Sequence, residues 1–325
     1  MSNQTSVETL DWLYSYWQKN PSELRWEPLF MLPPWLMCWT RNFSSGRQPS
    51  VVAIRNGRQI TGIAPLLIEN STARLVGSPD VCDYLDIVCA PNQEQDFCTA
   101  LLHWMKTNNI NTFKVGIVRP DSLVATILKD VALKSGYQVI NEPDEMSPET
   151  LLPVTFNQYL QMLDAKQRHE VNRKARRLEE AGTVNYTTLS SSPDILASMD
   201  TFLKLFVASR EGKAKFLTPE MEIFFRDMAN TMSAQGLLRM GVLEIDSKVA
   251  ASVLAFEYHS TTYLYNSGFD PSLNRLSVGI LSKVYLIRDS ISSGMKKFDF
   301  LKGDEKYKSH LGGKEIQLRK ISIQL

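Results

Sequence analysis

The sequence predicts an α/β protein made of two similar modules in tandem, each a mixed sheet flanked by helices. The chain has 325 residues, which is enough for two ordinary domains. Both halves run through the same order of patterns: helices, an antiparallel hairpin, a third strand, a helix and another strand. The polar, proline-containing stretch "NEPDEMSPET" (141–150) lies between them. We therefore expect an N-terminal module at 1–150 and a C-terminal module at 151–325.

Composition excludes several classes of protein. The hydrophobic fraction is 43% and the formal net charge is +1, so no overall field favours nucleic acid or an anionic membrane. No secretory signal is visible, and the longest apolar patch (30–39) is too short to span a bilayer and contains two prolines. The four cysteines match no zinc or redox spacing, so we expect no metal and a reducing, cytoplasmic setting.

The first half is predicted to open with two tryptophan-rich helices and to continue through a hairpin. Asn56-Gly57 between two apolar, β-branched runs is a strong hairpin signal. The expected ranges are helices at 7–19 and 34–42, the two strands of the hairpin at 50–68, a short strand at 73–77, a polar loop at 78–88, a helix at 92–107, a strand at 112–118, a helix at 120–135, and closing strands at 136–140 and 149–154.

The second half is predicted to begin with a long basic helical stretch (155–182) that Gly182 ends. Ser192-Pro193 and Thr218-Pro219 each place a capping residue before a proline, which predicts the starts of two further helices. A three-stranded meander and an amphipathic helix follow. The expected ranges are strands at 237–245, 249–259 and 261–268, the helix at 277–293, a buried strand at 297–301, and a tail at 314–325 that alternates like an exposed edge strand.

The corner between the meander and the amphipathic helix is a candidate binding feature. If strands 261–268 and 297–301 are parallel neighbours, the helix between them is a crossover whose N-terminus lies at the carboxyl end of the sheet. Free N–H groups at such a terminus attract anions, and Gly279 would allow close approach to the backbone. Ser277-Val278-Gly279 is thus a pyrophosphate site, a plain N-cap, or both.

A charged and aromatic loop follows the neighbouring strand. It carries Asp304, Glu305, Tyr307 and Lys308. Loops at strand ends often hold catalytic groups, although most charge runs of this kind are simply solvated. The loop is therefore a candidate catalytic site only in combination with the corner.

These motifs resemble a known family. The run "YLYNSGFD", "LSVGILS" and "FDFLKGDEKYKSHLG" resembles the GNAT-type acyltransferase domain of the CelD/BcsL group, which was named for an association with cellulose biosynthesis and is related to FemAB-like aminoacyltransferases. Residues 165–182 and 76–88 are similar to other parts of that family. The resemblance is most specific over 261–312, and it departs from the family at Val278, where we expect proline. It implies two GNAT-like (acyl-CoA N-acyltransferase) modules.

The resemblance also implies a reaction: transfer of an acyl group from a thioester, usually acyl-CoA, to an amine or hydroxyl. Residues 277–279 match the phosphate-binding corner, and 307–312 are similar to a motif whose lysine lies in the reaction centre. In direct attack, Asp304 or Glu305 would accept the nucleophile's proton, Lys308 would stabilise the oxyanion, and Tyr307 would protonate the leaving thiolate. The second half has no cysteine, which excludes an acyl-cysteine intermediate there.

Other side chains are candidates for binding rather than chemistry. Arg168, in a basic helix that could be merely solvated, is expected to contact the adenosine 3′-phosphate of CoA. Tyr265 and Asp299 are expected to contact substrate. The first module lacks a Ser-x-Gly corner, so we expect that it has lost thioester binding and shapes the acceptor site through Asp83 and Tyr84.

The function expected from the sequence is therefore an acyltransferase acting on a small-molecule, sugar or peptide acceptor. An aminoacyl-tRNA-dependent FemAB-like ligase is one alternative, because the basic helix could bind tRNA. A catalytically silent GNAT-like partner protein in a polysaccharide pathway is another. The sequence does not indicate the acceptor, the acyl chain or the oligomeric state.

Overall fold

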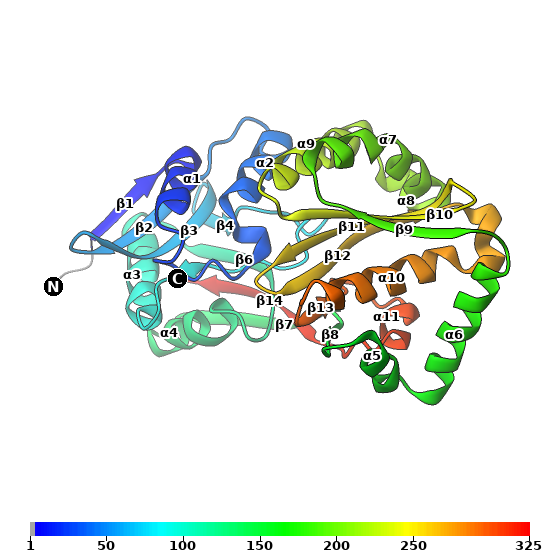
Figure 1. Ribbon diagram of the computed structural model, residues 1–325. Coiled ribbons are helices and arrows are strands. Elements are labelled where there is room, and N and C mark those ends of the chain that lie inside the picture. Colours follow the sequence, from blue (N-terminus) through cyan, green and yellow to red (C-terminus); the bar gives the residue numbers. More distant parts are fainter. Residues whose placement is uncertain (1–3) are drawn as a thin grey trace. The chain divides into compact units, whose positions relative to one another are not determined.

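The computed structural model describes residues 4–325 and divides into two compact units. Unit 1 comprises the described residues up to Met146 together with Ile316–Leu325, and unit 2 comprises Ser147–Glu315. Each unit is a mixed sheet with helices on both faces (Figure 1). This arrangement confirms the predicted fold class.

Unit 1 is built on a sheet with the strand order β1-β2-β3-β4-β6-β14-β7, and β5 pairs with β3. In Figure 1, α1 and α2 lie on one face of this sheet and α3 and α4 on the other. The strands are β1 (Gln4–Glu8), β2 (Ser50–Asn56), β3 (Gln59–Glu69), β4 (Thr72–Leu75), β5 (Val88–Cys89), β6 (Thr112–Val118), β7 (Gln138–Met146) and β14 (Gln317–Gln324). The helices are α1 (Leu10–Lys19), η1 (Leu29–Met31), α2 (Pro33–Phe43), α3 (Glu94–Thr107), the π-helical turn η2 (Val124–Leu128) and α4 (Lys129–Lys134).

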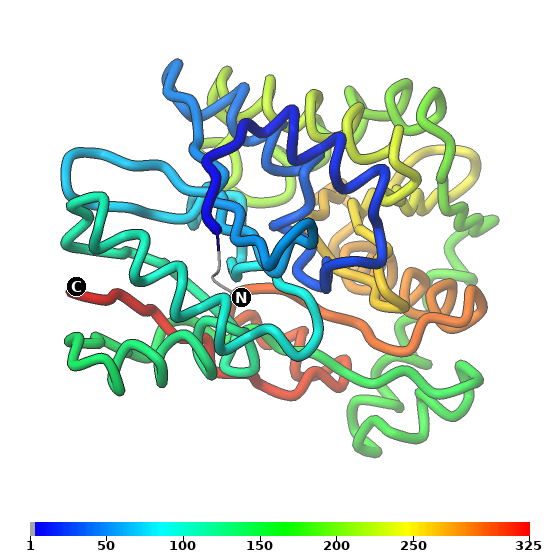
Figure 2. Tube along the Cα trace, turned by 90° about the vertical axis from the view of Figure 1, so that its left-hand side faces the viewer, coloured from blue at the N-terminus to red at the C-terminus, as the bar shows by residue number. Residues whose placement is uncertain are grey.

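The C-terminal tail corrects one prediction. It was expected to be an exposed edge strand, but β14 lies between β6 and β7 and pairs antiparallel with both. Its red trace can be followed in Figure 2 among segments from the first half of the chain. Leu318, Ile321 and Ile323 are fully buried, so the alternation in the tail reflects a half-buried internal strand. Unit 1 is therefore completed by residues from the end of the chain.

Unit 2 has the strand order β8-β13-β12-β11-β10-β9. β12 and β13 are parallel, as predicted, and the crossover between them contains α10. The strands are β8 (Glu149–Leu151), β9 (Val184–Leu189), β10 (Leu238–Ile245), β11 (Lys248–Tyr258), β12 (Thr261–Phe269) and β13 (Lys297–Asp299). The helices are α5 (Phe156–Met162), α6 (Ala165–Glu179), α7 (Ser192–Ser209), α8 (Glu211–Phe216), α9 (Pro219–Ala234), η3 (Pro271–Leu276), α10 (Val278–Ser292) and α11 (Lys306–His310).

The helices of unit 2 form two layers around its sheet. α7, α8 and α9 cover one face, and α10 covers the other together with α5 and α6 (Figure 1). The core under α10 includes Val253, Ala255, Ile287, Phe298 and Phe300. Burial of such side chains at roughly 25 cal/mol per Å² is what fixes α10 against the strands.

Local signals explain most helix starts in unit 2. Thr155 forms a reciprocal capping box with Gln158, and Ser191 and Thr218 accept from the backbone N–H three residues on. The predicted long helix at 155–182 is in fact two, because the Asp164 side chain caps a new helix by accepting from Gln167 N–H. The basic helix then ends at Glu179.

Three further expectations differ from the structure. Gly182 does not cap a helix; a Cβ there would come within 2.6 Å of the Asp246 carboxylate, so close packing requires the glycine. The polar stretch expected to be a linker lies largely in β7, which holds Pro143. The short elements β1, β9 and α8 were not predicted, because they lack a strong periodic pattern.

None of the described helices is long and apolar enough to cross a membrane. The apolar patch at 30–39 lies in η1 and α2, where Phe30, Leu36 and Cys38 are fully buried. This patch is therefore part of the core of unit 1.

Candidate functional site

The strands β12 and β13 separate after a short paired stretch. They pair only from Thr261 with Lys297 to Tyr263 with Asp299. β12 then continues to Phe269, with a bulge opposite Leu254 and Ala255, whereas the chain after Asp299 turns away. We call the gap between the diverging segments the β12/β13 opening. It lies at the carboxyl ends of the two strands, where the loops before α10 and α11 also begin.

Asp299 produces the turn that opens this gap. Its side chain is fully buried, and its Oδ1 accepts from Leu301 N–H at 2.8 Å. Leu301 has φ 57°, an uncommon left-handed conformation for a leucine. Asp299 was expected to contact substrate. Its burial and its backbone bond instead give it a structural role in this conformation.

The predicted corner is present, but Ser277 is not a side-chain N-cap. Ser277 has φ 57° and its side chain accepts no backbone bond from the first turn of α10. Its Oγ instead accepts a hydrogen bond from Arg177 Nη2 at 3.1 Å. The N–H groups of Val278 and Gly279, which open α10, have no acceptor within the helix because of their position.

Gly279 is small for a packing reason. A Cβ at this position would lie 2.7 Å from the ring of Phe269, the last residue of β12. The glycine therefore lets the start of α10 pack against the end of β12. The expected role in ligand approach is not needed to explain it.

Lys308 lies near the opening, and its ammonium group makes several hydrogen bonds. It is 3% exposed, and its Nζ donates to the carbonyl oxygens of Leu301 (3.0 Å), Lys302 (2.6 Å) and Gly303 (3.4 Å). The Nζ also lies 3.0 Å from Glu305 Oε2. These contacts use all the donors of an ammonium group, so Lys308 organises the loop.

Glu305 contacts this lysine, and Asp304 and Tyr307 lie in the same segment of the chain. Burial acts to raise the pKa of Glu305, but the charges of Lys308 and Arg210 outweigh it and lower the pKa below its usual value. Arg210 Nη1 lies 3.8 Å from Glu305 Oε1. Burial, and then the charge of Glu305, raise the pKa of Tyr307, so its phenol stays protonated at neutral pH. Asp304 is exposed.

Two lysines that sequence reasoning missed reach the opening from opposite helical layers. Lys213, from α8, donates to Ser267 O in the part of β12 that extends beyond its pairing with β13. Burial lowers the pKa of Lys213 to about 8. Lys283, from α10, is 5% exposed; its Nζ donates to Gly279 O at 2.7 Å and lies 5.0 Å from the ring centroid of Tyr307. Burial, followed by repulsion from Lys213 and Arg210, lowers the pKa of Lys283 to about 7.

The remaining predicted site residues of unit 2 lie in different surroundings. Tyr265 is half-buried on β12 at the bulge, and its ring centroid lies 5.1 Å from that of Phe256. Arg168 is half-buried near the start of α6, where its Nη1 lies 3.4 Å from Leu163 O. Arg177, near the end of the same helix, is the basic side chain that contacts the corner. Its Nε is buried without a hydrogen-bond partner among the described residues.

Comparison with known proteins agrees with this geometry. Residues 165–309 match the family model described as an acetyltransferase (GNAT) domain. Unit 2 has a GNAT-like fold. The match spans α6 to α11 and so includes the corner, the opening and the charged loop. No curated protein matches the chain.

Solved structures share the fold over the whole chain at low sequence identity. The crystal structure of FemX is 10% identical, covers 99% of this chain and 97% of that chain, and has a TM-score of 0.66. A conserved protein of unknown function from Bacteroides thetaiotaomicron is 12% identical, covers 100% of both chains, and has a TM-score of 0.62. A tandem GNAT protein from the clavulanic acid biosynthesis pathway is 10% identical, covers 99% and 98%, and has a TM-score of 0.51. Such identities show a shared fold alone.

Unit 1 has a counterpart of the opening, and its own chain fills it. β4 and β6 are parallel and pair only from Thr72 to Arg74. Beyond that point Leu85 N–H bonds to Ile117 O at 2.8 Å, and the Leu85 side chain packs beside Gly77. The residual cavity is about 160 Å³, compared with the 300–1,000 Å³ usual for ligand pockets. The loop at 78–88 thus lies at the end of the β4/β6 pair in unit 1.

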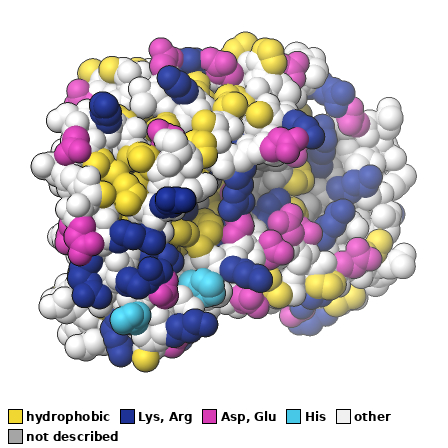
Figure 3. All heavy atoms as spheres, turned by 90° about the vertical axis from the view of Figure 1, so that its right-hand side faces the viewer, with side chains coloured by type: hydrophobic (Ala, Val, Ile, Leu, Met, Phe, Trp, Pro, Cys, Tyr) yellow, Lys and Arg dark blue, Asp and Glu magenta, His cyan; other side chains and the backbone are white. Residues whose placement is uncertain are grey.

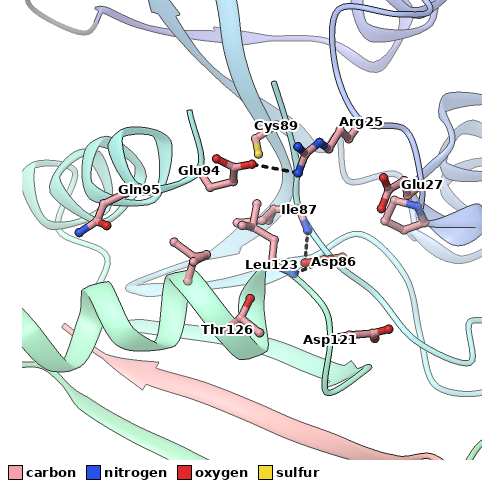
Figure 4. A pocket seen from close by; sticks show the side chains of 12 residues that line it. Arg25, Glu27, Asp86, Ile87, Cys89, Glu94, Gln95, Asp121, Leu123 and Thr126 are labelled. Atoms are coloured by element: carbon pink, nitrogen blue, oxygen red, sulfur yellow. Dashed lines mark hydrogen bonds and ion pairs between the residues drawn. The ribbon is translucent and has the colours of Figure 1, made fainter. Parts of the chain in front are cut away.

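The predicted acceptor residues of unit 1 differ in burial. Tyr84 is 5% exposed, with its ring edge-to-face on Phe30 and under Arg119. Asp83 is half-buried. A separate pocket of about 460 Å³ includes Asp86 in its lining but, among the described residues, neither Asp83 nor Tyr84 (Figure 4). Tyr84 is therefore a core side chain.

Asp86 forms the floor of that pocket. Its carboxylate accepts from the N–H groups of Ile87, Leu123 and Val124, and burial raises its pKa to about 7 although these bonds oppose the shift. Arg25 and Glu94 form an ion pair of 3.0 Å beside it (Figure 4). No group of three or more His, Cys, Asp or Glu side chains among residues 4–325 is placed to hold a metal.

Proposed function

We propose that the protein is an acyltransferase that binds acyl-CoA in the β12/β13 opening and transfers the acyl group to an amine or hydroxyl acceptor. The observation that carries this proposal is the position of the opening. It lies at the carboxyl end of a parallel strand pair, beside the free first turn of α10 and among several basic side chains. The match of residues 165–309 to a GNAT acetyltransferase domain supports it.

The proposed donor would lie along residues 264–269 of β12, on the side where β13 no longer pairs with this strand. Backbone groups after Tyr263 have no strand partner on the β13 side and can bond the amides of pantetheine. The pyrophosphate would lie at the N–H groups of Val278 and Gly279, where the helix dipole favours negative charge. Arg177, with its partner-free buried Nε and its contact to Ser277, would bind the same phosphates.

Replacement of Arg177 by methionine should weaken acetyl-CoA binding by roughly ten- to a hundredfold, because one charge-assisted phosphate contact is worth roughly 1.5–3 kcal/mol. Arg176→Met is the matched control, since Arg176 is exposed on the same helix. Titration calorimetry should show a lower affinity for acetyl-CoA in Arg177→Met and an unchanged affinity in Arg176→Met. Equal affinities for both variants and the unaltered protein would remove Arg177 from the phosphate site.

The residues around the opening can support direct attack on the thioester. Tyr307 keeps its proton at neutral pH and could give it to the departing thiolate. Glu305 is held ionised by Lys308 and Arg210, which makes it a weak base. Asp304 is exposed and remains a candidate proton acceptor. Lys308 would act by fixing the loop rather than by contacting the oxyanion, since its donors are already used.

For the acceptor we propose that unit 1 contributes, as expected from the sequence. Its pocket has an apolar wall of Ile87, Leu123 and Ile127 together with acidic groups, which suits an acceptor that carries an amino group. Incubation with acetyl-CoA and a panel of amino sugars, amino acids and peptides should release free CoA thiol with at least one of them. Absence of release with every acceptor would favour a silent partner protein.

The FemAB-like alternative has a specific observation in its favour. Basic side chains gather on the surface of unit 2 where α6 lies, at the lower left of Figure 3. The FemX structure shares the fold over nearly the whole chain. If the donor were an aminoacyl-tRNA, tRNA binding should weaken steeply with salt. We expect acetyl-CoA, rather than tRNA, to bind at physiological salt.

Two finer assignments belong to the same proposal. Membership of the CelD/BcsL group rests on the resemblance of residues 261–312. A cytoplasmic location is supported by the four cysteines, which are buried and form no disulfide among the described residues.

A further inference from the structure

Lys283 is a buried ammonium group without a carboxylate partner. It is 5% exposed, and among the described residues its Nζ has one hydrogen bond, to Gly279 O at 2.7 Å. An ammonium group has three donors, and burying one unpaired is costly enough that such a group usually loses its proton instead. The Nζ also lies 5.0 Å from the ring centroid of Tyr307. The fold therefore keeps a lysine here although it has only one hydrogen-bond acceptor among the described residues.

The charges that face Lys283 are mostly of the same sign. Lys213 approaches from α8, Arg210 from the residue just before that helix, and Lys308 from α11. Glu305 is the one acid that acts on Lys283, and it is already engaged by Lys308 at 3.0 Å and Arg210 at 3.8 Å. The cluster thus has four basic groups and one carboxylate. The cluster therefore has an excess of positive charge, which an anionic ligand could neutralise.

The side chain of Lys283 runs back toward the start of α10. Side chains on a helix point toward its N-terminus, and the bond to Gly279 O places Nζ beside the first turn. Arg177, with a buried Nε that has no partner, approaches the same turn from α6. The buried Lys283 and the half-buried Arg177 therefore approach the same helix N-terminus.

We propose that Lys283 is the counter-ion of a phosphate group that binds at the first turn of α10, and that it takes up a proton when this phosphate arrives. The inference rests on the proposed function, in which the phosphate belongs to acyl-CoA. The low pKa of Lys283, about 7, supports it. A nearby anion favours the charged ammonium, so binding and protonation strengthen each other.

The test is titration calorimetry of acetyl-CoA at pH 7.5 and pH 8.5, each in two buffers of different ionisation enthalpy. The unaltered protein should take up roughly half to one proton per ligand, and its affinity should fall up to about tenfold over that pH unit. Lys283→Arg, which is always charged, should bind with an affinity that falls less over that pH unit than the affinity of the unaltered protein. The phosphates of acetyl-CoA also titrate, so the proton uptake of this variant is the reference.

Lys283→Met provides a second variant in case the bulkier arginine disturbs the fold. It should bind acetyl-CoA at least tenfold more weakly at pH 7.5 and lose the Lys283-dependent proton uptake. Equal proton uptake in the unaltered protein and Lys283→Met would overturn the inference, even though the proposed donor was bound. If acetyl-CoA does not bind at all, the proposed donor is wrong. The same titration with inorganic pyrophosphate then tests the inference without the proposed donor. Proton uptake that depends on Lys283 would support the inference, and absence of binding or of proton uptake would overturn it.

Discussion

Replacement of Lys283 by methionine is expected to stabilise the protein at neutral pH. The substitution removes an ammonium group that is 5% exposed and has no carboxylate partner among the described residues. It keeps a side chain of similar length and volume. We expect a gain of about 1–3 kcal/mol in the free energy of unfolding, the usual cost of an incompletely satisfied buried polar group.

The sign of the pH dependence follows from the lowered pKa of Lys283, about 7 in the folded chain against 10.5 for a free lysine. Between these values the unfolded chain binds more protons, so stability rises with pH. The penalty of the lysine is complete below pH 7 and disappears as the pH approaches 10.5. The gain in Lys283→Met should therefore be larger at pH 6.5 than at pH 9.

Urea denaturation at the two pH values measures this difference directly. Lys204→Met is the matched control, because Lys204 is exposed on α7 and its replacement should change stability by less than about 0.5 kcal/mol. A loss of stability in Lys283→Met at pH 6.5 would mean that the ammonium group is satisfied in the fold. The idea of a lysine waiting for an anion would then be wrong.

The second large effect is expected at Lys308, with the opposite sign. Lys308→Met would leave the carbonyl oxygens of Leu301, Lys302 and Gly303 without their donor and remove the positive charge beside Glu305. A buried polar group left without its hydrogen bond costs about 1–3 kcal/mol, and the loss of the charge beside Glu305, whose side chain is 36% exposed, adds less. We expect a large fall in stability, and loss of the ordered loop at 301–308.

Lys306→Met is the control for this prediction, since Lys306 is exposed in the same short helix. The two variants can be compared by their urea midpoints and by proteolysis of the loop. A Lys308→Met protein as stable as the control, but without acyl transfer, would return Lys308 to a direct catalytic role. The opposite signs at Lys283 and Lys308 arise from their partners, because both side chains are almost fully buried.

Much of the fold could be predicted because its elements have clear local patterns. The meander, the amphipathic α10 and the parallel pairing of β13 with β12 follow from periodicity and from the handedness of crossovers. The place of β14 could not be predicted in this way. Strand order is a long-range property, and an alternating strand can lie at an edge or inside a sheet.

The site was predictable as a region but not as a set of side chains. The corner and the charged loop were found from their positions after β12 and β13. Lys283 was missed because it lies in the apolar run "GILSKVYLI", where a single lysine matches no catalytic or binding motif. A lone lysine among apolar neighbours on both sides is the signal that could have found it. Lys213 has no such signal, because α8 is short and polar.

The central claim is that the β12/β13 opening of unit 2 holds the acyl thioester, and hydrogen–deuterium exchange with acetyl-CoA tests it most directly. We expect slower exchange at residues 264–269 of β12, at the first turns of α10 and in the loop at 301–308. Residues 72–77 and 112–118 of unit 1, where Leu85 closes the equivalent gap, should be unchanged. Protection confined to unit 1, or none in unit 2 at saturating acetyl-CoA, would contradict the account.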